Sequence, residues 1–498
     1  MPACAAEATP RYRPRAASNA LKEIVEDSLE ELLRSWDARF AKDCGPLPRR
    51  LRGQLEAFLR CGDAHFGFLR LRCVSPECTQ KQELILPFSC KVRGLCPSCG
   101  QRRAIQWAER MVEEVLPVVP YRQLVFTIPR RLRKYFLFDR SLYGDLCRAA
   151  YASTRDFLRK QTPAALVRLK RAVPAMVVVP QSFADLLVPH AHAHAICSLG
   201  LFSPDGTFHR MEDVDFSGLE AVFRERVFGF MVKRGKITPE VAEAMRAWPH
   251  SGFQVNFQRK LERDDRKGLE GLLTYMDRPA VSLRRLTYRD DGKVHYQGTR
   301  FHPRLGTDHQ LLSPVEFMAL VTTHVLLRYQ VTLRSYGAAS TTFRKKAGWI
   351  ERPPVDGPPR STFGAAALPA QSPPAPVSAP VPPPPGRGGS REESDFIKKR
   401  RGNWARLIHK TWLVDPCLCS SCHKPMKILA AISSPEQDDV IERILRARGA
   451  WDPPWQRAPR ARGPPPPEPS TRVVSGETID PQLDADDYYE RPVTREDS

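Results

Sequence analysis

The spacing of apolar residues along the chain predicts a mixture of helices and strands. Between Ile24 and Phe40 the apolar side chains return at the three-to-four-residue spacing of one helix face. Short runs rich in Val, Phe and Ile instead predict strands. We expect helices at 24–40, 141–160 and 261–277, and strands at 121–128, 175–179, 189–196 and 426–432. The pattern therefore predicts an α+β protein.

Proline-rich stretches divide the chain. Thirteen of the thirty-three residues from Pro353 to Pro385 are proline, a composition that favours an extended linker over a packed core. A second run, from Pro453 to Pro469, opens a tail that we expect to be disordered. The expected division is a first unit at 21–116, a second at 117–350, a linker at 351–396, a short cysteine-containing unit at 397–451 and a tail at 452–498.

The chain is strongly basic, since 77 lysines and arginines against 56 acids give a net charge of +21. This surplus favours a phosphate backbone as partner and argues against an enzyme of small metabolites. No stretch is apolar enough to span a membrane, and the first thirty residues hold no signal-peptide core. We therefore expect an intracellular, cytoplasmic protein with reduced cysteines, which makes clustered cysteines candidate metal ligands.

Two cysteine pairs in the first unit predict a structural zinc site. Cys73 with Cys78, and Cys96 with Cys99, lie about twenty residues apart, the arrangement of two short knuckles around a tetrahedral zinc ion. The first pair is stretched, with four residues between its cysteines. Cys61 and Cys90 lie nearby and are alternatives as ligands, and buried reduced cysteines without metal are the other interpretation.

A second group of cysteines follows the proline-rich linker. Cys417, Cys419 and Cys422 precede His423 and a short strand. The group has one close pair, so a complete zinc site needs Cys417, His423 or a distant ligand. A metal-free ribbon is the alternative.

Three histidines alternate with alanines between Pro189 and Ile196. Alternate side chains on a strand share a face, so His190, His192 and His194 are expected to point the same way. Neighbouring ones stand roughly 6.5–7 Å apart, and imidazoles at that spacing can converge on one metal ion. Together with the basic charge, they predict a divalent metal that acts on a phosphodiester.

Tyr275 is the candidate nucleophile. It lies near the end of an expected helix, which Arg278 and Pro279 should terminate. Arg278, Arg284 and Arg285 are placed to hold phosphates. From these residues alone, a half-buried structural role for the tyrosine remains the alternative.

Several of these segments resemble one family. His192-Ala193-His194 resembles the histidine, bulky apolar residue, histidine signature of HUH nucleases, which cut single-stranded DNA with a tyrosine. The whole chain outside the proline-rich regions resembles the rolling-circle transposases of bacterial insertion sequences. The segments that carry this resemblance are 58–63, 65–68 and 89–100 for the zinc-binding domain, 117–129, 181–187 and 272–279 for the nuclease, and 404–429 for a carboxy-terminal ribbon.

The resemblance implies an architecture and a branch of the family. It implies an HUH nuclease domain with a central antiparallel sheet, preceded by a zinc-binding domain and followed by a small zinc-ribbon-like module. Gly271 stands where two-tyrosine members carry another tyrosine. The chain therefore resembles the single-tyrosine branch, which is associated with common-region elements.

The resemblance also implies a mechanism. Mg²⁺ or Mn²⁺ would be held by His192 and His194, with His190 or Gln181 as a third ligand. Tyr275 would attack single-stranded DNA at the element's end and form a 5′-phosphotyrosine. The phosphodiester energy is kept in that bond, so no nucleotide cofactor is needed, and the sequence has no phosphate-binding glycine loop followed by Lys-Ser or Lys-Thr.

The expected partners are single-stranded DNA and element-end DNA, within a bacterial nucleoid. Arg130 and Arg131, with Trp107, Phe126 and Tyr135, are candidates for contacts with phosphates and unpaired bases. A solvated basic face is the alternative for this segment. The oligomeric state stays open.

Three rival functions remain at this stage. An inactivated copy of the element would keep the fold and lose the reaction. A replication initiator or relaxase would share the histidine and tyrosine site. A zinc-ribbon DNA-binding protein would use the histidines only as structure. This last alternative differs from the nuclease in whether His192, His194 and Tyr275 lie close together.

Overall fold

The structure, a computed structural model, describes residues 19–162, 171–211, 214–303, 305–326, 332–349, 418–453 and 455. The expected linker, most of the expected tail and Cys417 lie outside these residues. Within them, no helix combines the length and the apolar content needed to cross a membrane. The helices are α1 (Ala20–Arg39), α2 (Ala41–Cys44), α3 (Leu51–Leu59), η1 (Ala64–Phe66), α4 (Pro97–Arg110), η2 (Met111–Val115), α5 (Arg130–Phe138), α6 (Leu142–Lys160), η4 (Asp185–Leu187), α7 (Leu219–Lys233), α8 (Pro239–Arg246), α9 (Arg266–Met276), η5 (Leu283–Arg285), α10 (Pro314–His324), α11 (Thr341–Lys346) and α13 (Asp438–Arg446).

The strands are β1 (Gly67–Cys73), β2 (Glu83–Pro87), β3 (Tyr121–Thr127), β4 (Ala175–Phe183), β5 (Pro189–Ser198), β6 (Gly200–Phe202), β7 (Phe208–Arg210), β8 (Gln254–Leu261), β9 (Leu286–Tyr288), β10 (Val294–His302), β11 (Thr307–Leu312), β12 (Arg334–Gly337) and β13 (Met426–Ser433). The mixed α+β fold with antiparallel sheets is confirmed. So are the expected elements in α1, β3, α6, β4, β5 and β13.

One expected helix boundary is wrong. The sequence predicts a helix from residue 261, but α9 begins at Arg266, because Leu261 is the last residue of β8. Asp265 caps the helix, its side chain accepting a hydrogen bond from the Gly268 backbone N–H at 2.8 Å. Leu261 is apolar and packs in the same core as α9. The sequence pattern therefore included it in the helix.

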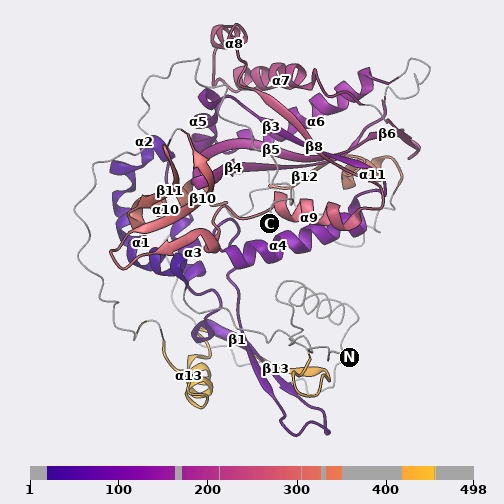
Figure 1. The fold of residues 1–498 in the computed structure, drawn as a ribbon. Coiled ribbons are helices and arrows are strands. Elements are labelled where there is room, and N and C mark those ends of the chain that lie inside the picture. The colour runs from indigo at the N-terminus through magenta and orange to yellow at the C-terminus, as the bar shows by residue number, and fades with distance from the viewer. Residues whose placement is uncertain are drawn as a thin grey trace, which may run out of the picture.

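The central sheet has five strands in the order β12-β4-β5-β3-β8, and every neighbouring pair is antiparallel. One face packs on a core shared with α5, α6 and α7, and Ala191, Ala193 and Ala195 of β5 lie in that core. The other face packs against α9, with Val179 and Leu273 in one cluster. Figure 1 shows α7 and α8 above the sheet, and α4 and α9 below it. The histidines, which alternate with the alanines, therefore face α9.

The amino-terminal helices do not form a unit of their own. Helices α1 and α3 share a core with α10 and with the three-stranded sheet β11-β10-β9, so that Trp36, Tyr296 and Phe317 belong to one apolar cluster. The expected boundary at residue 116 therefore separates residues that pack together.

The carboxy-terminal segment also differs from the expected separate module. Strand β13 pairs with β1, from Gly67 opposite Ser433 to Cys73 opposite Met426, in a three-stranded sheet of order β13-β1-β2. Figure 1 shows β1 and β13 side by side, below the central sheet. Strand β13 thus completes the sheet of the amino-terminal part. The long sequence separation of β1 and β13 is the reason that the sequence did not predict this pairing.

Buried His324 makes the stability depend on pH. Its ring bonds the Leu187 carbonyl through Nε2 at 2.9 Å and the Ser182 hydroxyl through Nδ1 at 3.0 Å, which fits a neutral imidazole. Burial lowers its pKa to about 4, helped by Arg140 and opposed by the bond to Leu187. The unfolded chain then binds a proton below pH 6.5 that the folded chain excludes, so stability falls as the pH drops from 6.5 towards 4.

We expect His324→Gln to remove up to about 1.4 kcal/mol per pH unit from that pH dependence. Urea unfolding at pH 7 and pH 5 measures it for both proteins. His309→Gln is the control, because His309 is an exposed histidine and its replacement should keep the wild-type slope. Equal slopes in the His324→Gln protein and the wild type would contradict the assignment.

Candidate active site and metal centres

The three histidines of β5 lie in a buried row on the face that α9 covers. His190, His192 and His194 are each at most 4% exposed. The Nε2 atoms of His192 and His194 are 3.1 Å apart. Two imidazole nitrogens that each bind one ion at about 2.1 Å, at right angles, stand about 3 Å apart. This pair therefore has the separation of two ligands of a single metal ion.

The protonation of these rings suits a metal. The Nδ1–H of His192 donates to the His190 carbonyl at 2.9 Å, which leaves the Nε2 lone pair for a ligand. Burial holds the pKa of His194 well below its usual range, and the charges of His192 and Arg278 add to this. Burial, followed by the charge of Arg133, does the same for the pKa of His190. Neutral imidazoles are the form that binds metal.

His190 is less well placed as a third ligand. Its ring stacks on that of His192, with centroids 4.7 Å apart and planes at 25°. Among the described residues, the groups of three or more His, Cys, Asp or Glu with ligand atoms all within 4.8 Å of one another are two sets of cysteines, so the three histidines do not make such a group.

Gln181 is the better placed of the two alternatives. It lies opposite His192 in the pairing of β4 with β5, so both side chains are on one face. Its Nε2 donates to the Met276 carbonyl at 2.8 Å, which fixes the amide. Its Oε1 is buried and has no hydrogen-bond partner among the described residues. A buried carbonyl oxygen beside two imidazoles is a suitable ligand for Mg²⁺ or Mn²⁺.

Helix α9 brings Tyr275 to the histidine pair. The rings of Tyr275 and His194 have centroids 6.0 Å apart and meet edge to face at 82°. Tyr275 is 41% exposed, so it is open to a substrate. The Arg278 guanidinium lies over the tyrosine ring, 4.4 Å from its centroid. The structure therefore brings His192, His194, Gln181, Tyr275 and Arg278 together.

Helix α4 holds α9 in place. Gly100 of α4 lies against Pro279, where an added Cβ would approach the proline ring to 3.3 Å. Arg103 Nε lies 3.9 Å from an Asp277 oxygen, and burial raises the pKa of Asp277 to about 6 although Arg103 and Arg93 oppose the shift. At the other end of α9, Arg266 bonds the Val112 carbonyl in η2. Sequence analysis missed these contacts, which the basic and acidic residues alone do not reveal.

The other predicted DNA-binding arginines lie at varied places. Arg130 and Arg131 open α5, just after Thr127, which lies opposite His192. Arg284 is exposed in η5. Arg285 is less available, because it pairs with the Asp185 carboxylate.

Strand β8 adds polar side chains that sequence analysis did not select. Gln254 lies opposite Thr127 and Asn256 opposite Val125, which in turn pairs with His194. The Phe253 and Val255 side chains, which alternate with them along the chain, belong to the other core. Gln254 and Asn256 therefore extend the polar surface from the histidines towards the sheet edge.

The cysteines are grouped differently from the expected set. The expected site joined Cys73 and Cys78 to Cys96 and Cys99, but the structure places these pairs in two separate sets of four. Cys96 and Cys99 open α4 and face the end of α3, whereas Cys73 ends β1, beside the carboxy-terminal segment. The two sets are Cys61, Cys90, Cys96 and Cys99, and Cys73, Cys78, Cys419 and Cys422.

The first set, which we call cluster 1, has the dimensions of a zinc site. The sulfur of Cys61 lies 3.8 Å from that of Cys96 and 3.7 Å from that of Cys99, and the Cys90 and Cys99 sulfurs are 3.7 Å apart. A tetrahedron with zinc–sulfur bonds of about 2.3 Å has sulfurs about 3.8 Å apart. Cys61 and Cys90, the alternatives in the sequence, are thus full members of the cluster.

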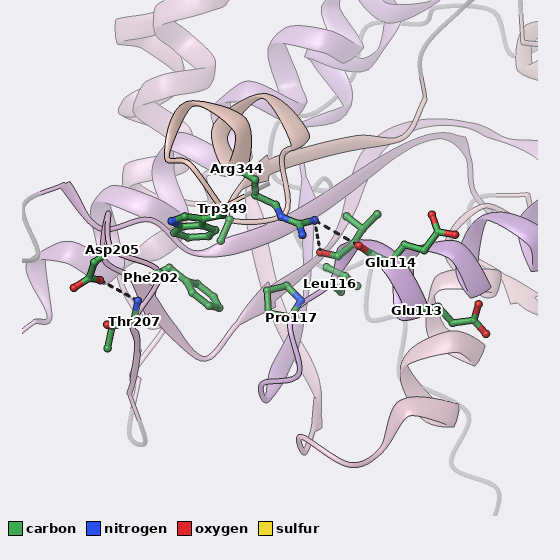
Figure 2. A pocket seen from close by; sticks show the side chains of 12 residues that line it. Glu113, Glu114, Leu116, Pro117, Phe202, Asp205, Thr207, Arg344 and Trp349 are labelled. Carbon is green, nitrogen blue, oxygen red and sulfur yellow. Dashed lines mark hydrogen bonds between the residues drawn. The ribbon is translucent and has the colours of Figure 1, made fainter. Parts of the chain in front are cut away.

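A cavity of about 590 Å³ lies beside η2, which follows the carboxy-terminal end of α4. Cluster 1 lies at the opposite end of that helix. In Figure 2, Phe202 and Trp349 form one side of it, and Arg344 reaches the backbone carbonyls of Glu114 and Val115, each 3.5 Å away. Its lining includes none of the three histidines and not Tyr275. The bonds from Arg344 hold η2 in place at the edge of this cavity.

Comparisons with known proteins find similarity to transposases. Residues 32–128 match a family model described as "Transposase zinc-binding domain", and residues 175–347 match one described as "Putative transposase". The transposase for insertion sequence element IS801 of Pseudomonas savastanoi pv. phaseolicola is 24% identical over 297 residues, covering 56% of this chain and 68% of that protein. "Putative transposase y4qJ" of Sinorhizobium fredii is 35% identical over 120 residues, covering 24% and 28%. No solved structure gives a significant match.

The two family models together span more than half of the chain. The chain belongs to the DNA transposases that have an amino-terminal zinc-binding domain. Within that class, it is a rolling-circle insertion-sequence transposase of the IS91 type. The zinc-binding domain and the two cysteine clusters support structural zinc.

Proposed function

We propose that this transposase cuts and joins single-stranded DNA at the ends of its element through a covalent bond to Tyr275. The observation that carries the proposal is the edge-to-face contact of Tyr275 with His194, whose Nε2 lies 3.1 Å from that of His192. An attacking hydroxyl beside a pair of metal-ready imidazoles is the arrangement that a metal-assisted phosphodiester cleavage requires. A protein that merely binds DNA needs no such contact.

In this proposal His192, His194 and Gln181 hold Mg²⁺ or Mn²⁺ in an HUH-type site. Gln181 is favoured over His190 by its position: it lies opposite His192 with its amide fixed by the Met276 carbonyl, whereas the His190 ring stacks on that of His192. When bound, the ion supplies positive charge beside the scissile phosphate. Two imidazole ligands make Mn²⁺ the better chemical fit.

The reaction itself is carried by Tyr275. Its phenol oxygen attacks phosphorus and loses its proton, the bond between phosphorus and the 3′ oxygen breaks, and that oxygen leaves as a hydroxyl after taking a proton. Arg278, stacked on the tyrosine, is placed to contact the phosphate. The product is a 5′-phosphotyrosine, and a later 3′-hydroxyl reverses the step and joins two strands.

The DNA would follow the basic surface around this site. Arg130, Arg131 and Arg284 are placed for phosphate contacts, and the net charge of +21 favours binding to nucleic acid. We expect a protein that acts on DNA ends to be in the bacterial cytoplasm, at the nucleoid. An initiator or relaxase would share the tyrosine reaction, and the transposase matches favour mobility of an element instead.

A covalent-adduct assay tests the proposal. The protein is mixed with labelled single strands from both flanks of its gene, with Mn²⁺ or Mg²⁺, and separated on a denaturing gel. We expect a labelled adduct that needs metal and survives detergent. Tight binding of the same strands without any adduct would indicate an inactive copy or a zinc-dependent DNA-binding protein.

We expect Gln181→Leu to raise the Mn²⁺ concentration needed for half-maximal adduct by roughly tenfold or more, because the site loses an oxygen ligand. The Mn²⁺-dependent rise in melting temperature should shrink in parallel. Gln123→Leu is the matched control, since Gln123 is also a buried glutamine on the central sheet and lies opposite Ile196. An unchanged Mn²⁺ requirement in Gln181→Leu would shift the third ligand to His190.

A further inference from the structure

The second set of cysteines, which we call cluster 2, joins the two ends of the described chain. Cys73 ends β1, the first strand of the amino-terminal sheet, and Cys78 follows it, whereas Cys419 and Cys422 precede β13, its last strand. The Cys73 and Cys422 sulfurs lie 3.6 Å apart, and the Cys78 and Cys419 sulfurs 3.9 Å apart. These values bracket the spacing of about 3.8 Å in a zinc–thiolate tetrahedron and far exceed a disulfide bond of about 2.05 Å.

Strand pairing explains why these four residues meet. Strands β1 and β13 are antiparallel, and Cys73, the last residue of β1, lies opposite Met426, the first of β13. The turn that follows Cys73 and the turn that precedes Met426 therefore stand at the same end of the sheet. Cys73 and Cys78 lie at the start of one turn and within it, and Cys419 and Cys422 lie in the other, so the sheet places four sulfurs in one group, all within 4.8 Å of one another.

The apolar core around cluster 2 is small. Outside the cysteines, its buried members are Leu71, Leu86 and Met426. Cys73, Cys78 and Cys419 are at most 3% exposed, so the sulfurs take the place that larger apolar side chains hold in an ordinary core. Elsewhere on this sheet Phe68 and Ile432 pack with Ile441 and Leu445 in a separate cluster. The part that carries the cysteines has little apolar burial of its own and needs a further constraint, and a structural metal is the usual one.

Other contacts around cluster 2 are specific to this docking. The Gln82 side chain accepts hydrogen bonds from the Ser420 backbone N–H at 3.1 Å and hydroxyl at 2.7 Å, and Ser421 bonds Gln80 at 2.6 Å. Arg448 pairs with Glu83 at 2.7 Å. The β1–β2 turn therefore recognises the carboxy-terminal knuckle through polar groups as well as sulfur.

We propose that Cys73, Cys78, Cys419 and Cys422 bind a second zinc ion, which clasps the carboxy-terminal segment onto β1. The amino-terminal zinc domain is then built from both ends of one chain. Sulfur donors in a tetrahedral group select zinc among the common divalent ions of the cell. This inference does not depend on the tyrosine reaction, because it concerns how the domain is assembled.

Zinc content gives the first test. We expect two zinc ions per wild-type chain, one per chain in the Cys419→Ser/Cys422→Ser double variant and two in Cys44→Ser, whose cysteine lies in neither cluster. Zinc is measured by elemental analysis of protein shown to be folded by circular dichroism. One zinc ion in the wild-type protein, or two in the double variant, would overturn the proposal.

Cleavage of the chain gives the second test. A protease site is introduced between residues 353 and 385, and the cut protein is passed over a gel-filtration column. We expect the two fragments to elute together in zinc buffer and to separate after a chelator, and to separate without a chelator in the double variant. Fragments that stay together in all three conditions would show that docking needs no metal.

A swapped arrangement is the remaining outcome. If the uncut protein elutes as a dimer and the double variant as a monomer, the carboxy-terminal segment belongs to a second copy, and the clasp within one chain is wrong. Neither test uses DNA. A negative adduct assay therefore leaves the zinc result intact, and a failed zinc test leaves the tyrosine reaction intact.

Discussion

Tyr275→Phe is expected to abolish covalent adduct formation, with a loss of more than about 10⁴-fold, while single-stranded DNA still binds. The variant keeps the ring that meets His194 edge to face and that stacks under Arg278, and it removes only the attacking oxygen. The fold and the basic surface should therefore stay as they are. Adduct is measured on a denaturing gel, and binding by the anisotropy of a labelled strand.

Tyr288→Phe is the control for this experiment. Its hydroxyl bonds the Asp27 carboxylate at 2.7 Å, at an exposed position outside the site, so adduct should form at the wild-type rate. A Tyr275→Phe protein that still forms adduct would mean that another residue is the nucleophile. A protein that loses both adduct and binding would mean that Tyr275 supports the fold.

The second large effect is expected from Cys96→Ser in cluster 1. Zinc bound by four thiolates contributes about 10–16 kcal/mol in small zinc domains, as much as the whole stability of a typical domain. Its loss should unfold the start of α4. Because Gly100 and Arg103 of that helix contact Pro279 and Asp277, we also expect adduct formation to fall by at least about a hundredfold.

Zinc content, melting temperature and adduct rate together test this expectation. The double variant at Cys419 and Cys422 is the matched control, since it also removes zinc ligands but leaves α4 and α9 in contact, and it should keep the adduct rate. If Cys96→Ser loses zinc yet forms adduct normally, cluster 1 does not position Tyr275.

Local patterns predicted most of the expected elements well. Alternation of histidine with alanine was enough to expect one polar and one apolar face on β5, and the structure confirms that Ala191, Ala193 and Ala195 lie in the opposite core. The sequence left the third ligand open between Gln181 and His190. Our proposal of Gln181 depends on the register of β4 against β5 and on the bond from Gln181 to Met276, neither of which the residues encode locally.

The cysteine grouping failed for the same physical reason. Cys73 and Cys78 lie close in sequence to Cys96 and Cys99, and proximity suggested one site. Because β1 pairs with β13, Cys73 and Cys78 instead lie beside Cys419 and Cys422, more than three hundred residues further along the chain. The spacing of cysteine pairs along a chain predicts a shared metal site only when the loop between the pairs folds back and brings them together.

The pairing of β1 with β13 also has a consequence for synthesis. A ribosome adds about 5–20 residues per second, so β1 leaves it roughly 20–70 seconds before β13 is made. For that time β1 lacks one of its two neighbours, and Phe68, which packs against Ile432, lacks that cover. The nascent transposase therefore carries an open strand edge that chaperones are suited to protect. Its amino-terminal domain matures only after β13, more than three hundred residues further along the chain, has been made.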